Sequence, residues 1–310
     1  MIVTVTMNPA IDKTVDIDAL ERGGLNRIHH VELDAGGKGI NVSKTIHELG
    51  GKSIAVGFIA GIAGKIIRSV MDEWKIENDF IEVCGETRTN TKVFERTGEL
   101  TELNEPGPIV EEKDVRALYN KLEGYADENT LFVLAGSVPQ GVNKDIYREI
   151  IELVHKKGAK VLLDAAGELF TSALDAGPDI IKPNKVELEQ YAGMDYIASE
   201  QELLTVAERL MKKGIATIAV SMGKNGAMFL QDGFKVKCPG LKVKAHSTVG
   251  AGDAMVAALS YAWSEGLSPQ DTVKMCMAVS AGAVTTIGTK PPSRKMVDAL
   301  LEQVAVENLG

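Results

Sequence analysis

Two glycine-rich turns in the sequence have the composition of anion-binding sites. The first covers residues 36–39 and contains Lys38; the second covers residues 250–252 and is followed by Asp253. Each turn directly precedes an apolar stretch that predicts a helix. Glycines let successive backbone N–H groups face one point, and the unpaired amides and dipole of a helix start favour an anion there. The second turn therefore predicts a site that holds a phosphoryl group, with Asp253 as the base that takes a proton from an acceptor hydroxyl.

Each turn also has a simpler interpretation. An acid in the first turn of a helix is ordinary capping, and a glycine turn can be merely flexible. Lys38 favours the functional reading, because the dipole of a helix start disfavours a cation unless an anion is bound nearby. The same dipole is expected to keep the pKa of Asp253 low. Neither turn has the Walker A pattern, and no Gly-x-Gly-x-x-Gly follows a strand, which weakens a nicotinamide-dependent oxidoreductase as an alternative.

Other polar residues follow expected strands or lie in polar segments. Asp12 comes just after the first strand and could accept hydrogen bonds from sugar hydroxyls. Arg27 and Arg88 lie in two polar segments, and the guanidinium fork suits phosphate oxygens. Asn184 and Glu187 supply oxygens that could organise Mg²⁺-bound water. Taken alone, Asp12 and each of the two arginines fit a solvated surface residue better than a site residue.

The apolar pattern predicts a three-layer, doubly wound α/β fold in one domain of residues 1–310. The expected strands are Ile2–Thr6, Ser53–Phe58, Thr130–Leu134, Lys160–Leu163, Asp179–Ile181 and Thr217–Val220. The expected helices are Ile40–Leu49, Ile66–Trp74, Lys113–Tyr125, Lys144–Lys157, Ser199–Lys213 and Asp253–Ser264. Alternation of this kind predicts a mostly parallel central sheet with helices on both faces, and ligands beyond the carboxyl ends of its strands.

Two segments, residues 13–34 and 86–105, break this alternation. Both have the polar, alternating character of strands and do not resemble crossover helices. They are expected to pair as a small separate sheet that forms a lid over the edge of the main sheet. The alternative is a pair of surface hairpins without function.

Composition narrows the class of protein. The 310 residues carry a formal charge of −9 without a basic run, so nucleic acid and anionic membranes are not expected partners. Three scattered cysteines predict reduced thiols. No leader pattern and no apolar run of about 18 residues occurs, so a cytoplasmic location is expected.

Four motifs together carry a family resemblance that extends over nearly the whole chain. They are Asn-Pro-Ala-Ile-Asp at residues 8–12, Gly-Gly-Lys-Gly-Ile-Asn at 36–41, Lys-Pro-Asn-Lys-Val-Glu at 182–187 and Thr-Val-Gly-Ala-Gly-Asp at 248–253. In this order they resemble the ribokinase-like (phosphofructokinase B type) sugar kinases. The sequence is most similar to the 1-phosphofructokinase and tagatose-6-phosphate kinase group, through residues 85–90 and 101–108 as well.

The resemblance implies a role for each motif residue. Asp253 matches the catalytic base, and the anion hole matches Gly250, Ala251 and Gly252. The substrate side matches Asp12, Arg27, Gly37, Lys38, Asn41, Arg88 and Ser137. The nucleotide side matches Lys182, Asn184, Lys185, Glu187, Ser221, Gly223 and Gly226, with Asn184 and Glu187 organising the metal through water. The helix around Ala278–Gly282 is expected to contribute to the adenine pocket.

The implied function is ATP- and Mg²⁺-dependent phosphorylation of fructose 1-phosphate at its 6-hydroxyl. Tagatose 6-phosphate or fructose 6-phosphate as substrate remains an alternative, since all three reactions need the same acid, anion hole and phosphate clamp. A non-catalytic sugar-phosphate sensor is a distant alternative, because the residues of the catalytic turn are intact. The resemblance also implies a homodimer that pairs through the lid.

Overall fold

A large, mostly parallel sheet forms the centre of the molecule in the computed structural model, which describes residues 1–309. Its parallel strands are, in spatial order, β12 (Thr217–Ser221), β11 (Ile180–Ile181), β10 (Lys160–Asp164), β9 (Leu131–Ala135), β1 (Ile2–Thr6), β4 (Ile54–Ala60) and β5 (Glu77–Asn78), with β6 (Ile81–Val83) also paired to β4. Beyond β12 the sheet continues antiparallel with β13 (Ala227–Gln231), β14 (Phe234–Cys238) and β15 (Glu307–Asn308). The predicted α/β fold is confirmed.

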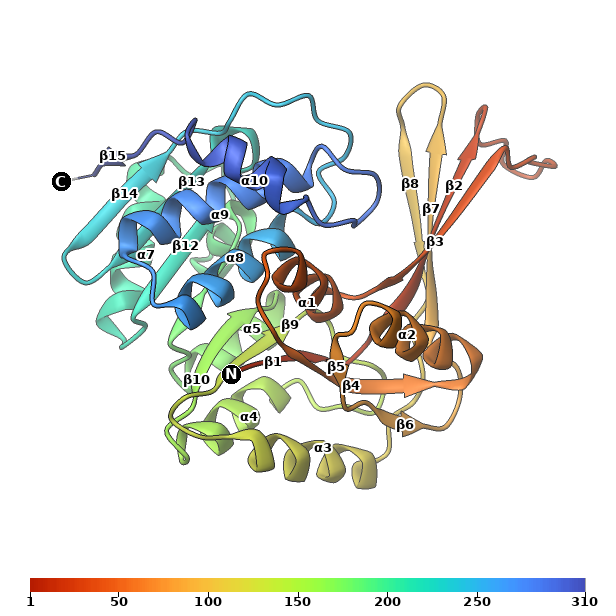
Figure 1. The fold of residues 1–310 in the computed structure, drawn as a ribbon, viewed down its shortest axis with the longest axis horizontal. Coiled ribbons are helices and arrows are strands. Elements are labelled where there is room, and N and C mark those ends of the chain that lie inside the picture. The colour runs from red at the N-terminus through yellow and green to blue at the C-terminus, as the bar shows by residue number, and fades with distance from the viewer. Residues whose placement is uncertain (310) are drawn as a thin grey trace.

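Helices cover both faces of this sheet (Figure 1). One layer contains α3 (Glu112–Tyr125), α4 (Ile146–His155), α5 (Gly167–Leu174), α6 (Lys185–Tyr191) and α7 (Glu200–Lys212). The other layer contains α1 (Lys38–Glu48), α2 (Gly61–Glu73), α8 (Ala251–Glu265), α9 (Pro269–Ala283) and α10 (Arg294–Leu301). A short 3₁₀ turn, η1 (Gly223–Asn225), joins β12 to β13. Since the central parallel strands are covered on both faces, their side chains are mostly buried and apolar, as in β9.

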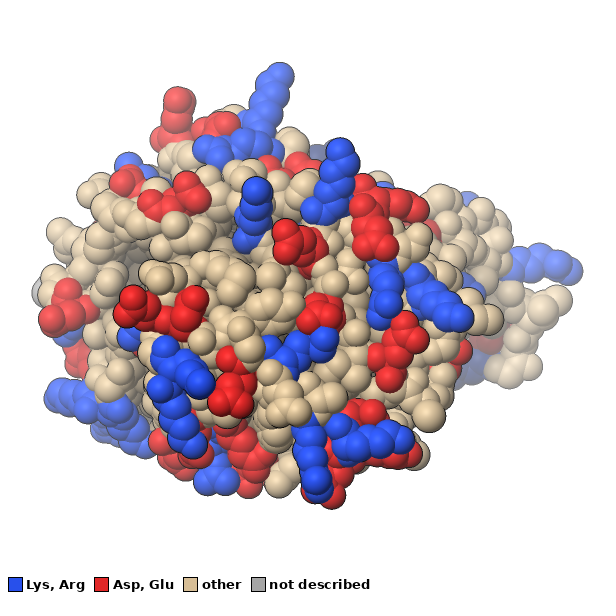
Figure 2. All heavy atoms as spheres, turned by 60° about the horizontal axis from the view of Figure 1, so that its bottom comes forward, with Lys and Arg blue, Asp and Glu red and all other residues tan. Residues whose placement is uncertain are grey.

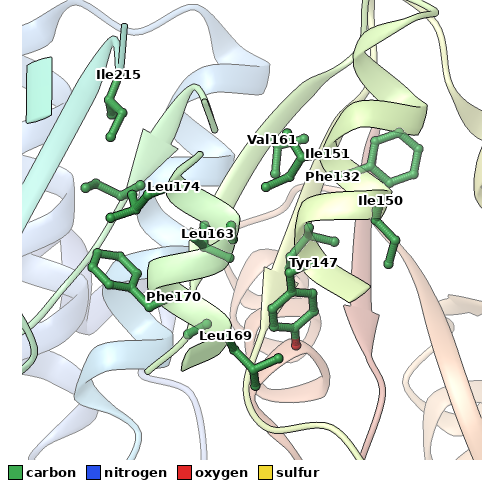
Figure 3. Close-up of a cluster of buried hydrophobic side chains, with 14 of the residues drawn as sticks. Phe132, Tyr147, Ile150, Ile151, Val161, Leu163, Leu169, Phe170, Leu174 and Ile215 are labelled. Atoms are coloured by element: carbon green, nitrogen blue, oxygen red, sulfur yellow. The ribbon is translucent and has the colours of Figure 1, made fainter. Parts of the chain in front are cut away.

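Separate apolar clusters fill the two interlayer spaces. On one side, Phe132 and Leu163 from the sheet pack against Tyr147 and Ile150 of α4 and Phe170 of α5 (Figure 3). On the other side, α8 and α9 pack against the opposite face of the same strands. The clusters hold the carboxyl ends of β1, β9 and β10 in fixed positions, and the loops that follow these strands carry the candidate site.

A second sheet of four strands projects from the main body (Figure 1). Its order is β3 (His30–Gly36), β2 (Ala10–Ile17), β7 (Arg88–Glu95) and β8 (Leu100–Asn104), and β2 and β7 run parallel. The two segments that break the helix–strand alternation therefore pair with each other, as expected. We call this the small sheet.

The polar alternation of the small sheet gives its two faces different characters. Asp12 and Asn90 are register partners and lie on one face, while Lys13 and Leu33 are partners on the other. The first face adjoins the glycine turn that opens α1, because a Cβ on Gly36 would lie 2.6 Å from Asp12 Oδ2. The alternation in the sequence therefore separates a polar, site-facing surface from an outer surface.

Charged side chains of both signs are mixed on the face of the molecule in Figure 2. Lys and Arg side chains form no continuous basic area on this face. Within residues 1–309, no helix is both long and apolar enough to cross a membrane. The three cysteines are free thiols, and only Cys84 is exposed.

Candidate active site

The amino-terminal turn of α8 presents unpaired backbone amides. Gly250 precedes the helix with φ 84°, a left-handed conformation that a side chain would strain, and it has no capping side chain. Within the described residues, the amides of Gly252 and Asp253 have no protein acceptor, as expected for the first turn of a helix. The turn therefore has the geometry of an anion hole that residues 250–252 were predicted to form.

Asp253 is buried beside this turn, with 8% of its surface exposed. Asn41 of α1 donates a hydrogen bond from Nδ2 to Asp253 Oδ2 at 2.8 Å. Burial raises the pKa of Asp253 to about 6, although Lys38 and the Asn41 hydrogen bond favour the charged form. The expectation that the helix dipole keeps this pKa low is therefore wrong, because loss of water outweighs the dipole. A carboxylate with this pKa can accept a proton near neutral pH.

The first glycine turn lies against β1 and β2. A Cβ on Gly37 would come within 2.8 Å of Thr6 Cγ2, and one on Gly36 within 2.6 Å of Asp12 Oδ2. Gly37 also has φ 112°, so both its conformation and its surroundings require glycine. This close packing brings the start of α1, with Lys38 and Asn41, next to Asp12.

Lys38 and Lys182 converge on one buried carboxylate, that of Asp164. Lys38 Nζ lies 3.1 Å from Asp164 Oδ2, and Lys182 Nζ lies 3.2 Å from Asp164 Oδ1. Burial lowers the pKa of Lys38, but the charges of Asp164 and Asp253 more than offset it and raise the pKa above its usual value. Lys182 also approaches the catalytic turn, because its Nζ would lie 3.5 Å from a Cβ on Gly252. The two ammonium groups thus lie on either side of one carboxylate, and Lys182 adjoins the start of α8.

A cavity of about 300 Å³ opens beside Lys38. Arg88 and Ser137 also line it, together with Thr6 and Asn8. Arg88 donates from Nη2 to the carbonyl oxygen of Asn8 at 2.9 Å, which fixes its guanidinium at the cavity wall. Two cations and a hydroxyl around one cavity suit the phosphate of a sugar phosphate.

Both carboxylate oxygens of Asp12 already have partners within the protein. Lys92 Nζ lies 3.1 Å from Asp12 Oδ2, and Asn90 donates from Nδ2 to Asp12 Oδ1 at 3.3 Å. Both partners come from β7, and Asp12 and Lys92 are buried. The pair therefore places a neutralised carboxylate on the site-facing surface of the small sheet.

Several buried polar atoms around the cleft have no hydrogen-bond partner. They are Thr6 Oγ1, Asn8 Oδ1, Asn41 Oδ1, Asn90 Oδ1, Thr289 Oγ1 and Asp164 Oδ1, whose contact with Lys182 is an ion pair only. Thr289 lies beside Gly250, and the others belong to the residues described above. Buried polar groups in proteins are almost always paired, so water or a polar ligand is expected to complete the hydrogen bonds of these atoms.

The predicted nucleotide side lies next to Lys182. Asn184 and Glu187 cap α6 reciprocally, each side chain accepting a hydrogen bond from the backbone amide of the other. Ser221 forms a β-bridge with Asn184, which brings the turn that contains Gly223 to the same place.

Three predicted residues lie elsewhere or have a structural explanation. Lys185 donates from Nζ to the carbonyl oxygen of Ala198 at 2.6 Å, and so turns toward the loop before α7. A Cβ on Gly226 would lie 1.8 Å from the carbonyl oxygen of Cys238, which explains the glycine by packing. Arg27 is exposed in the loop between β2 and β3, at the tip of the small sheet, and does not line the cavity.

The sequence interpretation missed Asp164, Lys92 and the role of Asn90. Asp164 ends a buried strand, and an acid in that position was a usable signal. Lys92 and Asn90 occupy alternate positions of β7 and therefore lie on the same face of the small sheet. Their position on the site-facing surface could have been predicted from this spacing. A larger hollow of about 590 Å³ near Lys75 lies at the amino end of β4, at the opposite edge of the sheet from the glycine turns.

The fold and the site define a class of enzyme. A buried carboxylate with a pKa of about 6 lies beside a helix start with free amides, and lysines connect this point to a cationic cavity. A site of this kind suits the transfer of a phosphoryl group to a hydroxyl of an anionic substrate.

Comparisons with known proteins identify the family. The model for pfkB family carbohydrate kinases matches residues 5–296. The 1-phosphofructokinases of Vibrio cholerae and Borreliella burgdorferi are 33% and 35% identical, over 99% and 100% of this chain and 97% and 99% of theirs. The structure of phosphofructokinase-2 from Escherichia coli has a TM-score of 0.93 and 26% identity, covering 97% of this chain and 98% of that one. The chain belongs to the pfkB family of carbohydrate kinases, and it is a phosphotransferase that acts on a sugar phosphate.

Proposed function

We propose that the protein phosphorylates fructose 1-phosphate at the 6-hydroxyl with ATP, giving fructose 1,6-bisphosphate and ADP. The observation that supports this proposal is the presence of two different groups of residues that suit an anion. Arg88 and Lys38 form the first, and the free amides at residues 252–253 form the second. A substrate that already carries one phosphate can bind to the first while its distal hydroxyl reaches Asp253. The names of the full-length relatives support the same substrate.

Asp253 and the anion hole have different roles in the proposed reaction. The oxygen of the acceptor hydroxyl attacks the terminal phosphorus of ATP, its proton passes to Asp253, and the bond to the oxygen of ADP breaks. The amides of Gly252 and Asp253 stabilise negative charge on the transferred group. Asn41 orients the carboxylate through its hydrogen bond.

The residues present are compatible with Mg²⁺ bound through nucleotide and water. Within residues 1–309, no three His, Cys, Asp or Glu side chains form a metal cluster. Glu187 and Asn184 each have one oxygen committed to capping, so phosphate oxygens and water would supply the remaining ligands, as Mg²⁺ prefers. When bound, the ion would neutralise phosphate charge and orient the terminal phosphoryl group.

Assembly as a homodimer through the small sheet is part of the proposal. The outer face of this sheet carries Leu33 and Leu103, which are 62% and 59% exposed. Both lie in the same cross-strand row, on the face opposite Asp12. Contact with a second copy would bury this apolar surface. Arg27 could then contact a phosphate only if its loop closes or a second subunit supplies it. Closure over the sugar, which would exclude water, and a cytoplasmic location stay predictions.

Initial rates with three sugar phosphates test the substrate. Fructose 1-phosphate, tagatose 6-phosphate and fructose 6-phosphate are each varied at saturating MgATP. We expect kcat/KM for fructose 1-phosphate to exceed the other two at least tenfold. A higher value with either 6-phosphate would reassign the substrate, and no transfer to any of them would reject the proposed function.

A further inference from the structure

Asp164 has no part in the chemistry described above, yet it is buried between Lys38 and Lys182, two cations of the candidate site. It ends β10 and is 1% exposed. Burial would raise the pKa of Asp164, but Lys182 and Lys38 hold the pKa below its usual value. The carboxylate is therefore charged and neutralised by two cations from different elements. A buried charge of this kind is costly unless its partners are well placed.

The two lysines that share this carboxylate both lie near Asp253, but each has a different further neighbour in the site. Lys38 opens α1 and lines the cavity that also contains Arg88. Lys182 follows β11 and approaches Gly252 of the anion hole. One end of the Asp164 carboxylate is thus paired with a cation of the sugar-phosphate cavity, and the other end with a cation of the transfer point.

We propose that Asp164 is a positioning residue that holds Lys38 and Lys182 apart and oriented, each toward a different phosphate, before either substrate binds. This inference rests on the proposed function. Without the carboxylate, two ammonium groups would face each other in a poorly solvated space, and repulsion would move at least one of them from its place. Preorganised charges of this kind cost no rearrangement when the reaction occurs.

We expect a single substitution at Asp164 to raise the KM of both substrates. An Asp164→Asn change keeps the shape but cannot pair with two ammonium groups. Since charge-assisted hydrogen bonds contribute substantially to binding, we expect KM to rise about tenfold for MgATP and about tenfold for the sugar phosphate. Arg88→Ala, by contrast, should raise only the KM for the sugar phosphate, which separates the two roles.

A coupling measurement distinguishes positioning from a purely structural role. In a Lys38→Met background, Asp164→Asn should raise the KM for the sugar phosphate less than twofold, because the lysine that it positions is gone. The acid limb of the kcat profile should also move to lower pH in Asp164→Asn. Lys38, Lys182, Asp164 and Asn41 face Asp253, and loss of one negative charge from this set lowers the pKa of Asp253.

Asp179 provides a matched control. It is a partly buried aspartate that also pairs with two basic side chains, His155 and Lys160, but it lies before β11 at the opposite edge of the sheet. Asp179→Asn should lower the melting temperature and leave both KM values unchanged. If Asp164→Asn fails to fold, Asp164→Glu keeps the charge while displacing it, and both KM values should still rise at least threefold.

The results that would reject the role of Asp164 differ from the results that would reject the proposed function. The variants are assayed with whichever sugar phosphate the wild-type protein prefers, and MgATP binding is measured by calorimetry without sugar. Weaker MgATP binding in folded Asp164→Asn supports positioning even if no tested sugar phosphate reacts. Unchanged KM values for both substrates, additive effects with Lys38→Met, or full recovery at tenfold higher Mg²⁺ would overturn the inference.

Discussion

We expect a single carboxylate, that of Asp253, to determine the pH dependence of this kinase. Burial raises the pKa of Asp253 to about 6, and the carboxylate must be deprotonated to accept the proton of the acceptor hydroxyl. We therefore expect kcat to fall as the pH drops below about 6, by about tenfold per unit well below that value. Initial rates at saturating substrates between about pH 5 and 8 measure the profile.

An Asn41→Ala variant tests whether the titration of Asp253 sets this pH profile. The hydrogen bond from Asn41 stabilises the charged form of Asp253, so Asn41→Ala should raise the pKa of Asp253 and move the acid limb to higher pH. A flat profile down to about pH 5 in the wild-type protein would show that Asp253 is not the group whose titration limits the rate.

Arg88 should affect binding without affecting chemistry. Its guanidinium lines the cavity and is held by the carbonyl oxygen of Asn8. Because a charged hydrogen bond contributes about 1.5–3 kcal/mol, we expect Arg88→Ala to raise the KM for the sugar phosphate about tenfold to a hundredfold. The KM for unphosphorylated fructose should change little.

Steady-state kinetics of Arg88→Ala and of Arg68→Ala test this assignment. Arg68 lies on α2 and pairs with Glu82, so its removal should leave both KM values unchanged. Equal effects of Arg88→Ala on the phosphorylated and the unphosphorylated sugar would remove Arg88 from the phosphate site.

At the scale of residues, the sequence identified the parts of the site that are continuous in the chain. Glycines and the acid of the turn before α8 are neighbours, so their chemistry could be recognised from spacing alone. Ion pairs between elements could not be found in this way. Asp12 and Lys92 are 80 positions apart, and their contact depends on the register of β2 against β7. The prediction of a low pKa for Asp253 was wrong because the burial of this residue depends on segments that are distant in the sequence.

Among the elements, β2 and β7 depend on a buried ion pair. Removal of one partner from such a pair is expected to cost about 3–5 kcal/mol, because the other charge stays buried. We therefore expect Lys92→Met to lower the free energy of unfolding by about this amount, and urea denaturation measures it. Lys13→Met, at the neighbouring position on the outer face of β2, should change stability by less than about 0.5 kcal/mol. A cost below about 1 kcal/mol for Lys92→Met would show that Asp12 stays solvated.

Some helices and strands are easier to predict from the sequence than others. Long strands of the parallel sheet and the helices α1, α3 and α7 have clear periodicity, and their predicted ends differ from the observed ones by two residues or fewer. The hairpin strands β13 and β14 were missed because their pairing depends on register rather than on a local pattern. The short helix α6 was missed too: its capping residues, Asn184 and Glu187, were assigned to metal, and the structure shows that they also start a helix.

For the whole molecule, exposed leucines on the small sheet predict association. Leu33 and Leu103 lie on its outer face, and burial of this surface by a second copy would stabilise a dimer. We expect sedimentation at micromolar concentration to show a dimer, and a Leu33→Asp, Leu103→Asp double variant to sediment as a monomer. Ile197→Asp, at a position that is 85% exposed before α7, should leave the dimer intact. A fully active wild-type monomer at this concentration would contradict assembly through the small sheet.

The most direct test of the whole account is the turnover number of Asp253→Asn. Asparagine fits the same space beside Asn41 and the anion hole but cannot accept the proton. With native thermal unfolding as evidence of folding, we predict that kcat for sugar-phosphate phosphorylation falls by about 10²–10⁴. A folded Asp253→Asn protein that keeps more than about a tenth of wild-type turnover would contradict the assignment of Asp253 as the base.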